Sequence, residues 1–227
     1  MQTQHQKQLT QLREKYQTNH VISQHEVHKI EELFLPYRSK ILANEKEETF
    51  DLLDDKGQTT GVTASRWLCH LIGFPHKSAN ILFKWTSPKL GSVFILQVRS
   101  WEKSDAPGAV DLSIGGHVTA GKTVLETAYQ EMEEEMGISI HDVVNQQLEN
   151  LGGKFTYTAK PEFQFYNHEW SELYLAELKT DALEKIYFQD GEVVGLYFCP
   201  EKEAINLLKK SRFPLATALQ KGLTKFL

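Results

Sequence analysis

The fold of this chain is decided by residues 115–138, which read GGHVTAGKTVLETAYQEMEEEMGI. A glycine-rich loop runs here into a segment with helical spacing of its apolar residues. Thr123 is placed to cap a helix, Glu126 follows three positions later as in a capping box, and Gly137 is placed to end it. The stretch therefore predicts a helix over residues 123–136 that begins directly after a glycine turn.

Three carboxylates lie on one face of this predicted helix. Glu131, Glu134 and Glu135 are spaced i, i+3 and i+4, so their side chains are neighbours, and their like charges repel. Oxygen ligands clustered in this way suit Mg²⁺ or Mn²⁺, and the adjacent glycine loop can add a backbone carbonyl and admit a phosphate. The competing interpretation is a solvated acidic helix face, which is the commoner origin of a charge run.

The same stretch resembles the Nudix box, a pattern of glycine, glutamate and apolar residues at fixed spacing. The matching residues are Gly116, Glu131, Met132, Glu134, Glu135, Gly137 and Ile138. Two positions depart from the pattern: Lys122 stands in place of a glutamate, and Gln130 in place of an arginine. Because the two family residues are oppositely charged, we expect that a supporting ion pair was lost as a unit while the three carboxylates remained.

The resemblance extends over residues 50–203, to the Nudix subgroup that is also similar to isopentenyl diphosphate isomerases. It implies an Mg²⁺-dependent hydrolase, with Mn²⁺ as a possible substitute, that cleaves the diphosphate linkage of a small nucleoside diphosphate derivative. It also implies a role for each residue of the box. The metal ligands would be Glu131, Glu134, Glu135 and the carbonyl of Gly115, and either Glu134 or Glu135 would also serve as the base.

Residues outside the helix complete the predicted site. Glu172 heads a predicted strand and is a candidate base, although a surface carboxylate is the more frequent role for such a residue. Arg99 ends a strand and could bind a phosphate through its planar guanidinium, while Gly116 and His117 would line the substrate loop. In the isomerases a histidine at the position of His117 belongs to a metal site. His76 and His117 are a weak indication of such a site here, because their spacing matches no metal motif.

Two other functions stay open on the sequence. The changes at Lys122 and Gln130 favour a binding module of Nudix fold with weak or no catalysis. An isopentenyl diphosphate isomerase is favoured by His117, but the catalytic cysteine of those enzymes falls on Gly115. We rank the hydrolase first, the binding module second and the isomerase third.

The composition excludes several classes of protein. The chain has 227 residues, 41% of them hydrophobic, and a formal net charge of -5, so it can form a core and carries no basic footprint for nucleic-acid polymers or membranes. Only Cys69 and Cys199 are present, too few for a disulfide scaffold. The N-terminal stretch lacks the apolar region of a signal peptide, and we expect a cytoplasmic protein.

Two regions differ in composition. Residues 1–48 are predicted to form a helical N-terminal arm that ends near Ala43, and residues 49–227 a Nudix domain with C-terminal helices. The spacing of Val27, Ile30, Leu33 and Phe34 indicates an amphipathic helix that packs on the domain or on a second subunit, so a homodimer is possible.

The order of the predicted elements indicates the α+β class. We expect a Nudix-type α/β/α sandwich with a mixed central sheet, since strands flank one central helix and two helices close the chain. Besides residues 123–136, a short helix is expected around 66–68, ending at Gly73. The predicted strands are 50–53, 79–86, 92–99, 110–114, 153–158, 162–167, 172–178 and 193–199, and the predicted terminal helices are 201–210 and 214–226.

Overall fold

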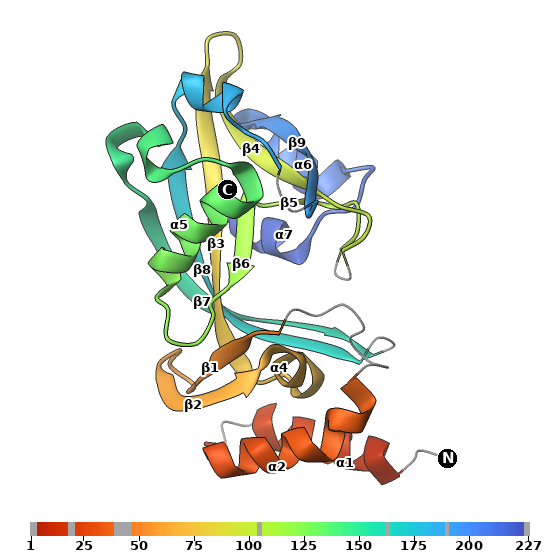
Figure 1. Ribbon diagram of the computed structural model, residues 1–227. Helices are drawn as coiled ribbons and strands as arrows, with labels where there is room; N and C mark the ends of the chain where they lie inside the picture. The colour runs from red at the N-terminus through yellow and green to blue at the C-terminus, as the bar shows by residue number, and fades with distance from the viewer. Residues whose placement is uncertain are drawn as a thin grey trace. The chain divides into compact units, whose positions relative to one another are not determined.

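A computed structural model describes residues 4–17, 21–38, 47–103, 106–161, 164–188 and 191–224 (Figure 1). The predicted end of the arm near Ala43 lies outside these residues. The chain divides into two compact units, which are described separately. Unit 1 comprises residues 1–78, 117–124 and 153–171, and unit 2 comprises 79–116, 125–152 and 172–227.

The described residues of unit 1 include the helices α1, α2 and α4 and a small hairpin. The helices α1 (Gln4–Gln17) and α2 (Gln24–Phe34) precede a 3-10 turn, η1 (Leu35–Tyr37). The strands β1 (Thr49–Leu53) and β2 (Thr59–Ser65) pair antiparallel, and α4 (Arg66–Ile72) follows. Gly73 ends α4 with a φ of 86°, a conformation that glycine adopts without steric cost, as the sequence predicted.

The first two helices share the core of unit 1 with the hairpin and α4. Val27, Ile30 and Phe34 are buried on one face of α2, as their spacing predicted. Leu33 is 41% exposed, so its predicted place on the buried face is wrong, because the apolar stripe of α2 is narrower than expected. The remaining members of this cluster include Leu9, Tyr16, Phe50, Leu52, Trp67, Leu68, Leu71 and Phe74.

The strands of the main sheet run in the order β5-β4-β3-β8-β7, with β6 paired to β3 and β9 paired to β4. Their bounds are β3 Pro75–Ser87, β4 Gly91–Arg99, β5 Val110–Asp111, β6 Ile114–His117, β7 Glu149–Lys160, β8 Phe165–Glu177 and β9 Val193–Pro200. The strands β3 and β4 contain the predicted strands 79–86 and 92–99 and pair antiparallel, with Phe83 opposite Ile95.

Two predicted strand boundaries are wrong. Residues 162–167 and 172–178 were expected as separate strands, but β8 runs continuously through 165–177, since no glycine or proline interrupts it. Conversely, the strand expected over 110–114 is split into β5 and β6. Between them the Asp111 carboxylate accepts from the amide of Leu112 (2.8 Å), and Ser113 Oγ accepts from the amide of Phe83 (2.7 Å). These side-chain hydrogen bonds replace the backbone hydrogen bonds that a continuous strand would make here.

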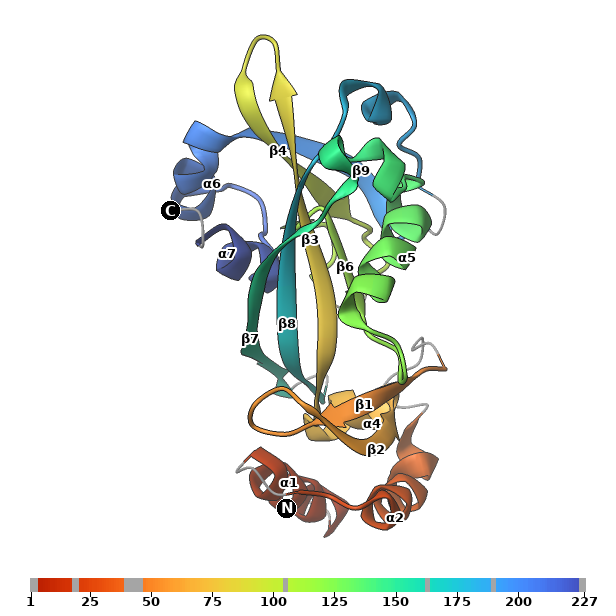
Figure 2. The same cartoon turned by 90° about the vertical axis from the view of Figure 1, so that its left-hand side faces the viewer.

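Helices cover both faces of the sheet in unit 2 (Figure 2). The predicted central helix is α5 (Val124–Met136), whose Met132 and Met136 are fully buried. On the opposite face lie α6 (Ala204–Lys210) and α7 (Thr217–Leu223), slightly shorter than predicted. A buried cluster joins them to the sheet: Phe94, Leu96, Val110, Leu112, Leu207, Leu219 and Leu223. No helix in the described ranges is long and apolar enough to cross a bilayer.

Candidate functional site

The first part of the site is the contact between the glycine loop and α5. A Cβ atom added to Gly116 would overlap the carboxyl group of Glu131. A side chain at this position would therefore displace Glu131, which explains why the loop has glycine here. The consequence is that one carboxylate of the helix lies directly against the backbone of the loop.

The second part is a buried carboxylate held by the sheet. Glu135 is only 3% exposed, and its Oε2 accepts a hydrogen bond of 3.3 Å from Nε2 of Gln97 on β4. Burial of a carboxylate is costly unless it is hydrogen-bonded, so this amide fixes Glu135 in one orientation. Gln97 was not predicted as a site residue. The feature of the sequence that could have indicated Gln97 is its polar side chain on a strand face that it shares with the apolar Val93 and Ile95.

The third carboxylate of the helix is exposed. Glu134 Oε1 accepts a hydrogen bond of 2.6 Å from Nε2 of Gln130, one helical turn earlier. Gln130 stands where the Nudix box has an arginine, and its amide binds the Glu134 carboxylate through a hydrogen bond without adding a charge. Glu133, on another side of α5, is also exposed.

The donor set of α5 fits a hard divalent cation. Glu131, Glu134 and Glu135 offer oxygen ligands on one helix face at three depths, and Gly116 lets the backbone approach them. Oxygen donors of this kind suit Mg²⁺ and Mn²⁺ better than soft metals. The assignment of these residues, and of the Gly115 carbonyl, as metal ligands remains a prediction.

Arg99 and Glu172 are placed in unit 2 by other contacts. Arg99 donates from Nη1 to Oδ2 of Asp111 at 3.2 Å, so its charge is partly compensated. Glu172 Oε2 lies 3.3 Å from Nδ2 of Asn150 and 3.4 Å from the hydroxyl of Tyr174. Burial, with the charge of Glu172 adding to it, raises the pKa of Tyr174 to about 12. The roles of phosphate ligand and base stay predictions for these two residues.

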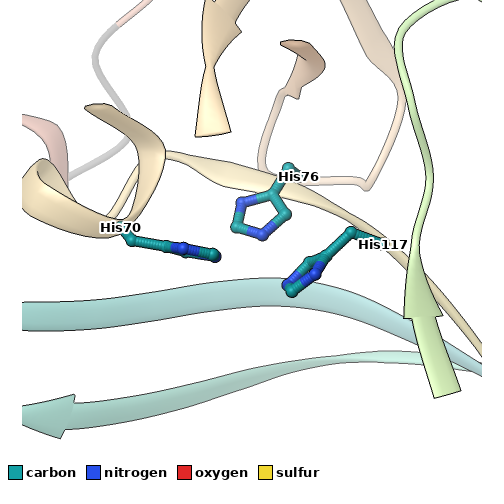
Figure 3. Close-up of side chains that lie close together, drawn as sticks. All are labelled: His70, His76 and His117. Carbon is teal, nitrogen blue, oxygen red and sulfur yellow. The ribbon is translucent and has the colours of Figure 1, made fainter. Parts of the chain in front are cut away.

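His117 lies in unit 1 within a group of histidines (Figure 3). In the described part of the chain, one group of potential metal-ligating side chains has all its ligand atoms within 4.8 Å of one another: His70, His76 and His117. Oε1 of Glu169 on β8 lies 2.9 Å from Nε2 of His117. The predicted role of His117 in substrate binding is not addressed by these contacts.

The charge states within this group follow from burial. Burial lowers the pKa of His76 well below its usual value, and the neighbouring His117 and His70 lower it further, so His76 is neutral. Burial alone would raise the pKa of Glu169, but His117, His76 and the hydrogen bond from Asn167 together lower it. Neither His70 nor Glu169 was predicted as a site residue. A histidine within the otherwise apolar run 67–74 was the available signal for His70.

The fold and the box together define the class of protein, and comparison with known proteins gives the family. Residues 76–221 match the NUDIX domain family, and the chain belongs to this family. The match confirms the predicted α+β Nudix fold, and the relatives that this chain resembles are named Nudix hydrolases. Proteins of this family generally use divalent metals.

Individual relatives were found among curated proteins and solved structures. Nudix hydrolase 3 of Arabidopsis thaliana is 32% identical over 165 residues, covering 72% of this chain. This chain matches only 21% of the length of that protein. An uncharacterized Nudix hydrolase of Clostridium acetobutylicum is 30% identical over 156 residues, covering 66% of this chain and 69% of its own length.

A solved structure supports the fold. The protein DR0079 of Deinococcus radiodurans superposes with a TM-score of 0.54 at 18% identity, covering 78% of this chain and 98% of its own. A likeness at this level of identity concerns the fold alone.

Proposed function

We propose that the chain is an Mg²⁺-dependent hydrolase that cleaves the diphosphate linkage of a nucleoside diphosphate derivative. One observation carries the proposal: the glycine loop is open at Gly116 where the Glu131 carboxyl lies, on the helix face that also carries Glu134 and Glu135. A surface helix needs no such fit between a glycine and one of its acidic side chains.

The three carboxylates of α5 share two tasks in this proposal: they hold the cation and accept a proton from the attacking water. Glu131, against the loop, and Glu135, oriented by Gln97, hold the cation on the helix face. Glu134 or Glu135 accepts the proton of the attacking water at a carboxylate oxygen. Glu134 is exposed, and the hydrogen bond from Gln130 leaves its Oε2 oxygen for this task or for the cation. Glu172 remains the alternative base.

The cation, when bound, neutralises charge on the diphosphate oxygens and makes the attacking water more acidic. Arg99 would add positive charge for a phosphate if its ion pair with Asp111 is exchanged for the substrate.

The direct test is a screen for hydrolysis with the purified chain. Nucleotide sugars, dinucleoside polyphosphates, dinucleotides and modified nucleoside triphosphates are incubated with Mg²⁺ or with a chelator, and released phosphate and nucleoside monophosphates are quantified. We expect hydrolysis of at least one class, lost with the chelator. Mn²⁺ in place of Mg²⁺ would show whether the site accepts either cation.

Glutamine variants then test the residues. We expect Glu134→Gln and Glu135→Gln each to lower kcat by about 10²–10⁴-fold, since a positioned base contributes that much. The matched control is Glu133→Gln, an exposed glutamate of the same helix that should keep the parental rate. Parental rates in both Glu134→Gln and Glu135→Gln, with unchanged circular dichroism, would contradict the assignment.

The binding module is the second candidate, favoured by the neutral Gln130 at the position of the family arginine. Calorimetric binding of a diphosphate compound without metal-dependent turnover across the screen would favour it over the hydrolase. A cytoplasmic location and a homodimer remain part of the proposal from the sequence. Sedimentation of the intact chain would test the dimer.

A further inference from the structure

Unit 1 brings three histidines together, and a glutamate, Glu169, lies beside one of them. His70 comes from the last turn of α4, His76 from the start of β3 and His117 from the end of β6. Their rings are turned toward one another, and the ligand atoms lie within 4.8 Å (Figure 3). His70 and His76 are buried, and the His117 side chain is only 17% exposed.

The geometry of His76 leaves one nitrogen suited to a metal. Its Nδ1 lies 2.8 Å from the carbonyl oxygen of Phe74, and since a carbonyl only accepts, Nδ1 carries the hydrogen. Nε2 then carries the lone pair. This atom is buried, and it has no hydrogen-bond partner among the residues that the structure describes. A backbone carbonyl on one imidazole nitrogen commonly orients the other toward a metal.

Neighbouring side chains hold the cluster in place. Phe50 stacks on His76 with 4.8 Å between ring centroids and on His117 with 5.1 Å. On β8, Oε1 of Glu169 accepts from Nδ2 of Asn167 at 2.8 Å, and Oε2 accepts from Oγ of Ser78 at 3.3 Å. The carboxylate is thus fixed 2.9 Å from Nε2 of His117.

The distances suit a small ion. Four ligands at about 2.0–2.1 Å in a tetrahedral site lie about 3.3 Å apart. The 2.9 Å between Glu169 and His117 needs only a small expansion, and the imidazoles, within 4.8 Å, need only small rotations to close on an ion. Imidazole and carboxylate together suit Zn²⁺ and similar ions, whereas Mg²⁺ prefers oxygen ligands and retains water.

We propose that His70, His76, His117 and Glu169 bind one transition-metal dication of the Zn²⁺ type, and that this ion joins α4, β3, β6 and β8 within unit 1. With four protein ligands the coordination sphere is closed, which is the arrangement of structural rather than catalytic zinc sites. The proposal uses none of the carboxylates of α5, and it shares only His117 with the loop residues predicted to bind the substrate.

The experiment measures metal content and binding in the full chain. The chain is purified without added metal, analysed for metals, stripped with a chelator, and titrated with Co²⁺ and Zn²⁺. We expect a bound transition metal on purification and, after stripping, saturable visible absorption of four-coordinate Co²⁺ that Zn²⁺ displaces and millimolar Mg²⁺ does not. We also expect Zn²⁺ to raise the Tm of the stripped chain.

Two variants test the ligands. His76→Gln and Glu169→Gln should each weaken Co²⁺ binding at least 10-fold. If His76→Gln does not fold, Glu169→Gln still tests the site, because glutamine has nearly the same shape as glutamate. His25→Gln, at an exposed histidine of α2, is the matched control and should bind as the parent does. X-ray absorption on the Zn²⁺-loaded chain should show nitrogen and oxygen ligands at about 2.0 Å.

Three results would overturn the proposal. The first is a folded, stripped chain that shows no saturable Co²⁺ absorption. The second is retention of parental Co²⁺ affinity in Glu169→Gln together with any folded His76 variant. The third is an equal loss of affinity in His25→Gln, which would assign the binding to surface histidines. Loss of hydrolysis in Glu134→Gln with unchanged Co²⁺ binding would show that the two sites are separate.

Discussion

Gly116 shows how the absence of one side chain determines the geometry of a carboxylate. The Glu131 carboxyl occupies the space into which a Cβ at residue 116 would project. The backbone φ of Gly116 is not in the left-handed region, so glycine is needed here for space and not for backbone conformation. Alanine at this position would therefore act mainly on Glu131.

We predict that Gly116→Ala lowers the rate of metal-dependent hydrolysis at least 10-fold, because displacement of a positioned group by about 1 Å can cost 10²-fold. The free energy of unfolding and kcat are both measured. Gly195→Ala is the matched control, since Gly195 has no positive φ and no atom within 4 Å of its added Cβ. Equal rates in the two variants would show that Glu131 tolerates displacement, or that it is not a ligand.

At the scale of elements, α2 begins with a complete capping box. Ser23 Oγ accepts from the amide of Glu26 at 3.3 Å, and Oε2 of Glu26 accepts from the amide of Ser23 at 3.0 Å. The hydrogen bonds from Ser23, backbone first, lower the pKa of Glu26 from 4.5 to about 2. The charged carboxylate is therefore the form that stabilises the start of the helix.

We predict that Ser23→Ala lowers the stability of α2 by about 1 kcal/mol at neutral pH. Because the folded-state pKa of Glu26 is depressed, its contribution is complete above pH 4.5 and is lost as the pH falls toward 2. The protection of the α2 amides from hydrogen exchange, corrected for the intrinsic rates, measures the stability of this helix. We expect the protection in the Glu26→Gln variant and in the parent to become equal as the pH falls over this range. Glu32→Gln, an exposed glutamate later in α2, should show no such convergence.

The elements show which features a sequence can predict. The helix 123–136 was predicted almost to the residue because its caps and its apolar spacing are local, as is Gly73 at the end of α4. The split between β5 and β6 was missed because it depends on Ser113 bonding to Phe83, a residue 30 positions away.

The acidic face of α5 and the histidine cluster also differ in how far apart their residues lie along the chain. The carboxylates of α5 were found because one helical turn brings them together, whereas the partner of Glu135, Gln97, comes from a strand 38 residues earlier. The histidine cluster combines residues 70, 76 and 117 with Glu169, so it exists only once β3, β6 and β8 have assembled. No spacing along the chain encodes that assembly.

At the scale of the whole molecule, the N-terminal helices are part of a core. The sequence predicted a boundary after residue 48, but residues on both sides of it belong to unit 1, and the apolar faces of α1 and α2 are buried with β1 and α4. Such a core implies that the arm helices and the hairpin depend on one another for stability. The NUDIX match, over residues 76–221, begins after these helices.

Two adjacent residues allow a direct test of this dependence. Phe34 is 1% exposed within the core of unit 1, whereas Leu33 is 41% exposed. We predict that Phe34→Ala destabilises unit 1 by about 3–5 kcal/mol, as is usual for truncation of a buried aromatic side chain. Leu33→Ala should change it by about 0.5 kcal/mol or less. Urea unfolding followed by Trp67 fluorescence, with the other tryptophans replaced by phenylalanine, measures both. Similar small changes in the two variants would mean that α2 is an appendage that unit 1 does not need.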